Sequence, residues 1–199
     1  MLKSYYTKDL IEAGCDEAGR GCLAGPVFAA AVILPSAPRI SGLNDSKKLS
    51  AIRREELRLG IEKHALSFAV GSVGSEEIDE INILNASFLA MHRALDMLAT
   101  CPGQILVDGN RFRPYRDVGH ICIIRGDGKY LSVAAASILA KTYRDDYMRE
   151  IDKQYPEYGW RKNMGYPTLQ HREAIKNYGL SDHHRRSFRL KNEQLSIEF

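Results

Sequence analysis

Short apolar runs alternate with glycine-rich or charged segments through the first third of the chain. An apolar run leads to Asp16 and Glu17, a Gly-Arg-Gly sequence follows them, and a longer apolar run covers 27–34. This arrangement predicts a strand, a tight turn and a returning strand. Alternation over 66–73 predicts a third strand, so the three strands should form an antiparallel meander.

Capping residues and apolar residues at helical spacing predict the helices. Ser50 and Thr168 are residue types that favour the N-cap, and each precedes an amphipathic segment. Small apolar residues dominate the first half of 131–153, which suits close packing of a helix on a sheet. The predicted helices cover 51–64, a segment that opens at 75–77, a longer segment over 84–98, 131–153 and 169–178.

Two further apolar runs, 104–107 and 120–124, predict a fourth and a fifth strand. The sequence therefore indicates an α/β fold with a five-stranded mixed sheet, flanking helices and a helical C-terminal portion. We expect one domain over 1–191, a basic helical portion from about 155 to 191 and a mobile tail over 192–199.

Four carboxylates lie where predicted strands end: Asp16, Glu17, Asp108 and Asp127. Taken alone, an Asp-Glu pair beside glycines is typical of a solvated hairpin tip. Three such strand ends in one sheet instead favour a shared site, because buried carboxylates are costly unless paired or bound to a cation. An all-oxygen donor set suits Mg²⁺ or Mn²⁺, and two such ions support phosphodiester hydrolysis.

The net charge of +3 is unevenly distributed. Between Trp160 and Lys191 there are eight lysines and arginines but only two acidic residues. Aromatic residues alternate with these cations, which favours a polyanion-binding surface over a merely solvated one. An acidic centre with a basic flank is typical of a nuclease, but neither feature distinguishes RNA from DNA. The interleaved aromatic residues are Trp160, Tyr166, Tyr178 and Phe188.

Other features narrow the class of protein. No apolar run approaches the ~20 residues of a membrane span, and the first residues lack the apolar core of a signal peptide. The four cysteines are scattered and suit a reducing compartment. We therefore expect a cytoplasmic monomer without membrane association. His171, His183 and His184 are expected to have structural or phosphate-side roles rather than to bind a metal.

Motifs along nearly the whole chain, in the same order, resemble those of ribonuclease HII, the type 2 ribonuclease H family. Cys22 and Arg125 are minor departures from the family pattern. The matching segments are 16–21, 23–27, 45–49, 107–109, 126–127, 135–141, 165–168 with His171, and 184–188.

This resemblance implies a ribonuclease H-like fold and a metal-dependent endoribonuclease that uses Mn²⁺ or Mg²⁺. Its substrates would be RNA–DNA hybrids and duplex DNA containing ribonucleotides, cut 5′ to the ribonucleotide to leave a 3′-OH and a 5′-phosphate. Two competing interpretations are a non-catalytic nucleic-acid-binding domain and a DNA nuclease of the same superfamily.

The resemblance also implies residue roles. Asp16, Glu17 and Asp108 would be the core metal ligands, and Asp127 would complete the set as a ligand or as an organiser behind it. The backbone of Gly19, Arg20 and Gly21 would meet a ribose 2′-OH, and Tyr166 the sugar of the next nucleotide. The implied phosphate contacts are Lys47, Ser137, Lys141, Arg185 and Arg186.

The C-terminal peptide from Gln194 to Phe199 has a polar first residue and apolar residues at its second, fourth and sixth positions. It resembles the short peptides by which replication and repair proteins dock on a sliding clamp, where alternate side chains of an extended segment bind. The alternative is that its apolar side chains fold back on the domain.

Overall fold

The computed structural model describes residues 2–38, 40–43, 46 and 49–188. Its centre is a five-stranded sheet in the order β3-β2-β1-β4-β5. β1, β2 and β3 are antiparallel neighbours, whereas β4 and β5 run parallel to β1. This confirms the predicted α/β fold with a mixed sheet. The strands are β1 (Glu12–Ala18), β2 (Val27–Ile33), β3 (Ser67–Val73), β4 (Gln104–Asp108) and β5 (Gly119–Ile123).

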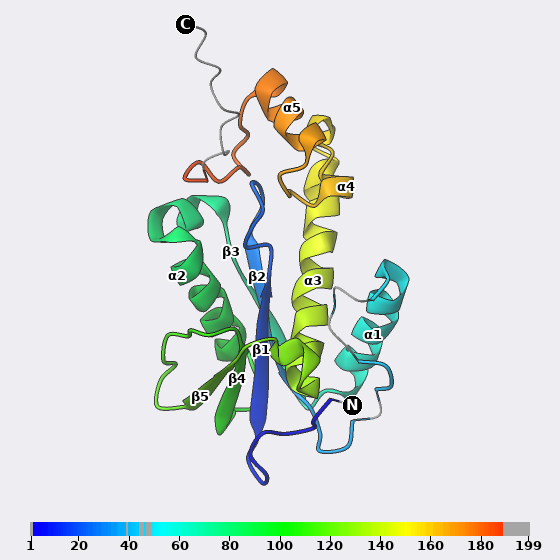
Figure 1. Cartoon of the computed structure of the whole chain (residues 1–199), viewed down its shortest axis with the longest axis vertical. Helices are drawn as coiled ribbons and strands as arrows, with labels where there is room; N and C mark the ends of the chain where they lie inside the picture. The colour runs from blue at the N-terminus through cyan, green and yellow to red at the C-terminus, as the bar shows by residue number, and fades with distance from the viewer. Residues whose placement is uncertain (1, 39, 44–45, 47–48, 189–199) are drawn as a thin grey trace, which may run out of the picture.

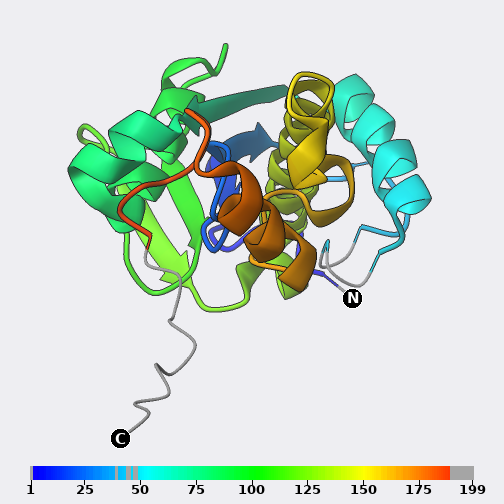
Figure 2. The same cartoon turned by 90° about the horizontal axis from the view of Figure 1, so that it is seen from above.

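Helices cover both faces of this sheet. α2 packs on one face, and α1 and α3 pack on the other (Figures 1 and 2). α4 and α5 lie beyond the end of the sheet where β1 finishes (Figure 1). The helices are α1 (Ala51–His64), α2 (Ser75–Asp96), α3 (Leu131–Asp152), α4 (Trp160–Asn163) and α5 (Leu169–Tyr178), with short 3₁₀ turns at η2 (Gly126–Gly128) and η3 (Pro156–Tyr158).

Local capping explains where several helices begin. The Ser50 hydroxyl accepts a hydrogen bond from the Arg53 amide, and Thr168 accepts one from the His171 amide, so both predicted N-caps are confirmed. The two helices predicted after Gly74 form one element, α2, with a break at Asn82 (φ 66°). The Asn82 side chain accepts the amide of Leu84 and thereby caps the second half of α2.

Close packing of α3 on β1 fixes the position of the strand that carries Asp16 and Glu17. A Cβ on Gly14 would lie 2.2 Å from the Ser132 carbonyl carbon, so only glycine allows this contact between backbones. Further along α3, Ile138 and Leu139 are fully buried. Each such side chain contributes about 1.5–3 kcal/mol on burial, which secures the helix against the sheet.

Residues 155–166, which lie between the predicted helices 131–153 and 169–178, contain the short elements η3 and α4. Trp160 is fully buried and stacks on Tyr158 with ring centroids 4.9 Å apart. The expectation that Trp160 belongs to a polyanion-binding surface is therefore wrong, because its indole packs in a small core of its own. No helix in the described part of the chain is long and apolar enough to span a bilayer.

Candidate functional site

The candidate site lies where β1 and β4 separate. The parallel β1–β4 ladder ends at the pair Cys15 and Val107, although β1 continues beside β2 as far as Ala18. Beyond the last pair of the β1–β4 ladder come Asp16, Glu17 and Asp108, and all three line one cavity of ≈ 460 Å³. Its other lining residues are Ala18, Gly19, Arg20, Gly21, Ser46, Arg54, Ser137, Lys141 and Tyr166.

Asp16 and Glu17 carry unfavourable electrostatics at this position. Asp16 is 6% exposed, and burial raises its pKa well above the usual range, with further repulsion from Glu17 and Asp108. Burial also raises the pKa of Glu17, although the Arg20 guanidinium, 3.0 Å from its carboxylate, opposes the shift. The site thus concentrates negative charge in a poorly solvated place, which a cation would relieve.

Asp108 and Asp127 occupy neighbouring strand ends. The Asp108 carboxylate accepts a hydrogen bond of 2.6 Å from the Gly126 amide, at the start of η2. Asp127 follows Gly126 and is 6% exposed, but it lies outside the set of residues that line the cavity. The structure therefore joins three of the four predicted carboxylates in one cavity and links Asp127 to them through its neighbour.

The donor set fits a hard divalent cation. All of the converging ligands are carboxylates, whose oxygens suit Mg²⁺ or Mn²⁺ better than zinc. Over the described ranges, no three histidine, cysteine, aspartate or glutamate side chains already stand in an arrangement that could hold an ion. Asp16 accepts the Glu17 amide, Glu17 is paired with Arg20 and Asp108 accepts the Gly126 amide, so all three carboxylates have other partners.

Polar groups from α3 line the opposite wall of the cavity. Ser137 is buried, with its hydroxyl 2.9 Å from that of Ser46, and Lys141 forms an ion pair of 2.7 Å with Asp145. The Lys141 ammonium also lies 5.9 Å from the ring centroid of Tyr166. Asp145 is not among the predicted site residues, because aspartates on helices are commonly solvated, but here it is buried, and its i,i+4 spacing from Lys141 allows the ion pair.

Two buried arginines hold the loop between β1 and β2. Arg144 donates to the carbonyls of Pro26, Met164 and Ala24 at 2.9–3.1 Å. Arg185 is 2% exposed and donates to the carbonyls of Arg20 and Gly25. Burial lowers the pKa of Arg185 to about 10, so it remains charged at neutral pH.

The placement of Arg185 argues against the phosphate contact predicted for it, because its donors already bind the loop backbone. Lys47, the phosphate contact predicted in the N-terminal half, lies outside the described residues. Arg54, which sequence reasoning missed, lines the cavity and donates to the carbonyls of Ser46 and Leu49.

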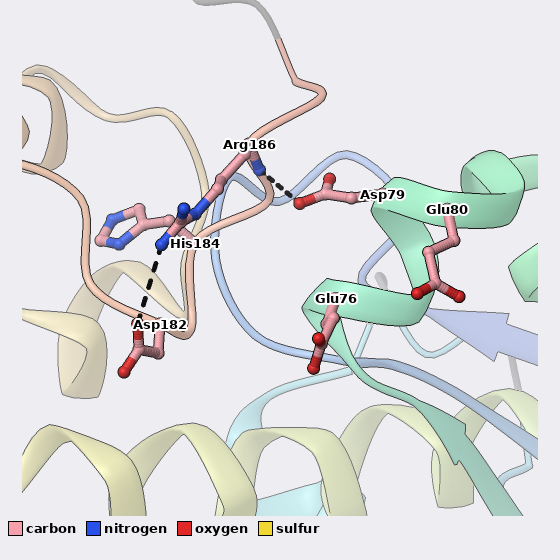
Figure 3. A pocket seen from close by; sticks show the side chains of 6 residues that line it. All are labelled: Glu76, Asp79, Glu80, Asp182, His184 and Arg186. Carbon is pink, nitrogen blue, oxygen red and sulfur yellow. Dashed lines mark hydrogen bonds and ion pairs between the residues drawn. The ribbon is translucent and has the colours of Figure 1, made fainter.

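Arg186 lies in a different cavity, of ≈ 520 Å³, between the start of α2 and the segment after α5 (Figure 3). Its backbone amide donates to Asp79, which also accepts the Ser187 amide, and its guanidinium is 3.8 Å from Asp182. Four of the six lining residues are acidic: Glu76, Asp79, Glu80 and Asp182. Their charge repels a phosphate, so this environment does not support the contact predicted for Arg186.

Comparisons with known proteins agree with the motifs. The family model of ribonuclease HII matches residues 13–191. Ribonuclease HII of Phocaeicola vulgatus is 61% identical and that of Christiangramia forsetii 59% identical, each over 100% of both chains.

Two solved structures are also similar. Ribonuclease H2 from Pyrococcus horikoshii has a TM-score of 0.74 and 30% identity, covering 89% of this chain and 93% of that one. A complex of PCNA with ribonuclease HII from Archaeoglobus fulgidus matches with a TM-score of 0.75 and 29% identity, over 94% and 98% of the two chains.

Proposed function

The chain belongs to the ribonuclease HII family and is an endoribonuclease that cleaves the RNA strand of RNA–DNA hybrids, and from this premise we propose that it also cuts 5′ to single ribonucleotides embedded in duplex DNA. Water attacks the phosphorus, the bond to the preceding 3′ oxygen breaks, and the products carry a 3′-OH and a 5′-phosphate. One observation carries the proposal: Asp16, Glu17 and Asp108 line the same cavity as the Gly19–Gly21 turn and Tyr166.

The carboxylates supply the catalytic part of this proposal. Asp16, Glu17 and Asp108 would hold Mg²⁺ or Mn²⁺, with Asp127 as a further ligand or as support behind Asp108. Two bound divalent ions would supply activation of the attacking water and stabilisation of the leaving oxygen. The raised pKa values of Asp16 and Glu17 support this assignment, because they reflect repulsion and burial that cation binding offsets.

Recognition of the ribonucleotide would depend on the turn and on Tyr166. A Cβ at Gly21 would meet no atom within 4 Å, so the backbone there is open to a 2′-OH. Tyr166 is 41% exposed, and burial of its hydroxyl raises its pKa, so the group stays protonated at neutral pH. Because the side chain is partly exposed, its ring is available to pack on the sugar of the next nucleotide. Ser137, Lys141 and Lys47 remain the proposed phosphate contacts.

Cleavage of a labelled DNA duplex with one ribonucleotide, beside an all-DNA duplex, tests this function. The assay would be run with Mg²⁺, Mn²⁺ or EDTA, and with Asp108→Asn as the matched inactive protein. We expect one cut 5′ to the ribonucleotide that is lost with EDTA and in the variant. Cleavage of both duplexes would indicate a DNA nuclease instead, and tight binding without a cut would indicate a binding domain.

We also propose that the peptide from Gln194 to Phe199, which lies outside the described residues, docks on a sliding clamp. Ribonuclease HII of Archaeoglobus fulgidus, 29% identical to this chain, was solved in complex with the clamp PCNA. A pull-down with the clamp would compare the full chain with a deletion of 194–199 and with Leu195→Ala/Phe199→Ala. Retention of clamp binding by both variants would rule out this role for the peptide.

A further inference from the structure

A third polar hollow lies on the loop that joins β4 to β5. It is shallow, has a volume of ≈ 550 Å³, and in Figure 1 its loop runs between α2 and the edge strand β5. None of the described residues that line it is acidic, in contrast to the hollow around Arg186. Its polar lining consists of Asn85, Asn110, Arg111, Arg113 and His120.

Two arginines of this loop are free to bind an anion. Arg111 and Arg113 are exposed, and neither forms an ion pair with a residue that the structure describes. Arg116, in the same loop, differs because its guanidinium is 2.6 Å from the Asp96 carboxylate and covers the ring of Tyr115. Within six residues the loop therefore carries two arginines without an ion pair to a described residue, Arg111 and Arg113, and one ion-paired arginine, Arg116.

The loop is held in place by aromatic packing, so the two arginines are presented rather than mobile. Phe112, between them, packs edge-on against Phe88, His92 and His120 at centroid distances of 5.2–6.1 Å. The His92 ring also donates a hydrogen bond of 2.9 Å to the Arg113 carbonyl. Fixing the loop beforehand lowers the entropy that binding would cost.

Chain connectivity joins this hollow to the strand that ends in Asp108. Asn110 follows Asp108 by two residues, and β5, which carries His120, is paired in register with β4. A duplex seated over Asp108 extends well beyond a 460 Å³ cavity and presents one phosphate charge per ~1.7 Å of axis. Its backbone must therefore cross neighbouring surface.

We propose that Arg111 and Arg113 form a second phosphate-binding surface, which contacts the duplex backbone outside the cleaved bond. This inference rests on the proposed function, since it extends the footprint of the same substrate. Guanidinium groups bind phosphate oxygens with two parallel hydrogen bonds, and the amides of Asn85 and Asn110 add neutral donors. Such contacts position the duplex without reading its sequence.

The salt dependence of binding tests the proposal. Fluorescence anisotropy would give the Kd of a single-ribonucleotide duplex across a KCl series, with Asp108→Asn in every protein to prevent cleavage. Arg111→Gln/Arg113→Gln should reduce the slope of log Kd against log[KCl] by about two and weaken binding on the order of tenfold. Arg116→Gln is the matched control and should leave both unchanged, because that arginine is already paired with Asp96.

A second measurement uses the cleavage-competent protein. There the double variant should raise KM several-fold and leave kcat unchanged, because the chemistry occurs at the carboxylates. A salt slope and KM equal to those of Arg116→Gln would overturn the proposal. A changed sedimentation coefficient with an unchanged slope would also overturn it, since it would indicate a protein interface. A wild-type protein that neither binds nor cuts would instead refute the proposed function itself.

Discussion

Arg144 and Arg185 are the residues that most constrain the shape of the site. Both guanidinium groups are buried, and their donors bind backbone carbonyls of the loop between β1 and β2. Carbonyl oxygens carry only partial negative charges, so they do not neutralise the two guanidinium groups beneath the turn that would face the substrate. They contribute positive potential where a polyanion approaches, besides holding the turn in one conformation.

Loss of Arg144 should therefore be costly. Arg144→Met leaves the carbonyls of Pro26, Ala24 and Met164 without their donors, and we expect a loss of about 2–4 kcal/mol in the free energy of unfolding. Urea unfolding measures it. Arg149→Met on the same helix is the control and should cost less than about 1 kcal/mol, since its ion pair with Asp146 is exposed. Equal losses in the two variants would contradict this role for Arg144.

The two glycines of the turn should respond differently to a methyl group. Gly19 has φ +92°, and a Cβ there would lie 2.0 Å from Nε of Arg144. Gly19→Ala should lower the free energy of unfolding by about 1–3 kcal/mol through strain and overpacking. Gly21→Ala meets open space and should change it by less than about 1 kcal/mol. Urea midpoints would decide, and an equal shift for both would disprove the predicted clash.

At the scale of elements, a neutral histidine network joins α4, α5 and the segment after them. Trp160 donates from Nε1 to Nε2 of His171, so the proton of His171 is on Nδ1 and is donated to the Tyr166 carbonyl. The Ser181 amide donates to Nδ1 of His184, whose Nε2 lies 3.2 Å from the same nitrogen of His171. The network fixes the backbone of Tyr166, and protonation of either ring breaks it.

Acid should destabilise this part of the fold. Burial lowers the pKa of His184 to about 4 and also lowers that of His171. A depressed folded-state pKa means that the unfolded chain binds the proton more tightly. Its contribution to stability is therefore complete above the ordinary histidine value of about 6.5 and is lost as pH falls towards 4.

We accordingly expect the melting temperature to fall by several degrees between pH 7 and pH 5. His184→Gln should be less stable at pH 7 and show a shallower pH dependence, as measured by circular dichroism. His64→Gln, on α1 and away from the network, should keep the wild-type dependence. If His184→Gln melts with an unaltered pH profile, the acid sensitivity has another source.

At the scale of the whole molecule, the C-terminal segment closes over the first loop. The Gly25 amide donates to the His183 carbonyl and the Arg185 amide to the Leu23 carbonyl, both at 2.8 Å. Asp79 of α2 caps the same segment at Arg186 and Ser187, as Figure 3 shows for Arg186. Residues far apart in sequence thus form one continuous support for the turn that lines the cavity.

Two truncations should distinguish this supporting segment from the residues after 188. A chain ending at residue 179 loses the bonds to 23–25, and we expect at least about a tenfold loss of cleavage and a lower melting temperature. A chain ending at residue 188 keeps those bonds and should cleave a single-ribonucleotide duplex at the full rate. Full activity in the shorter chain would show that the segment does not support the turn.

Most helices and strands could be predicted from local sequence patterns, because periodicity and N-caps depend on residues only a few positions apart. Ser50 and Thr168 illustrate this, and so do the carboxylates at the strand ends. The segment 155–166 resisted prediction because its short helices depend on a core built around Trp160.

Only the tertiary structure decided which cations are exposed and unpaired among the described residues. Arg185 lies in a basic run, yet its partner Gly25 is 160 residues away, so burial removed it from the predicted surface. Arg111 and Arg113 lie outside that run, and packing of Phe112 and the pairing of Arg116 leave them exposed. Sequence alone determined the family motifs and the acidic chemistry, whereas burial and ion pairing between distant segments determined the charge that remains available.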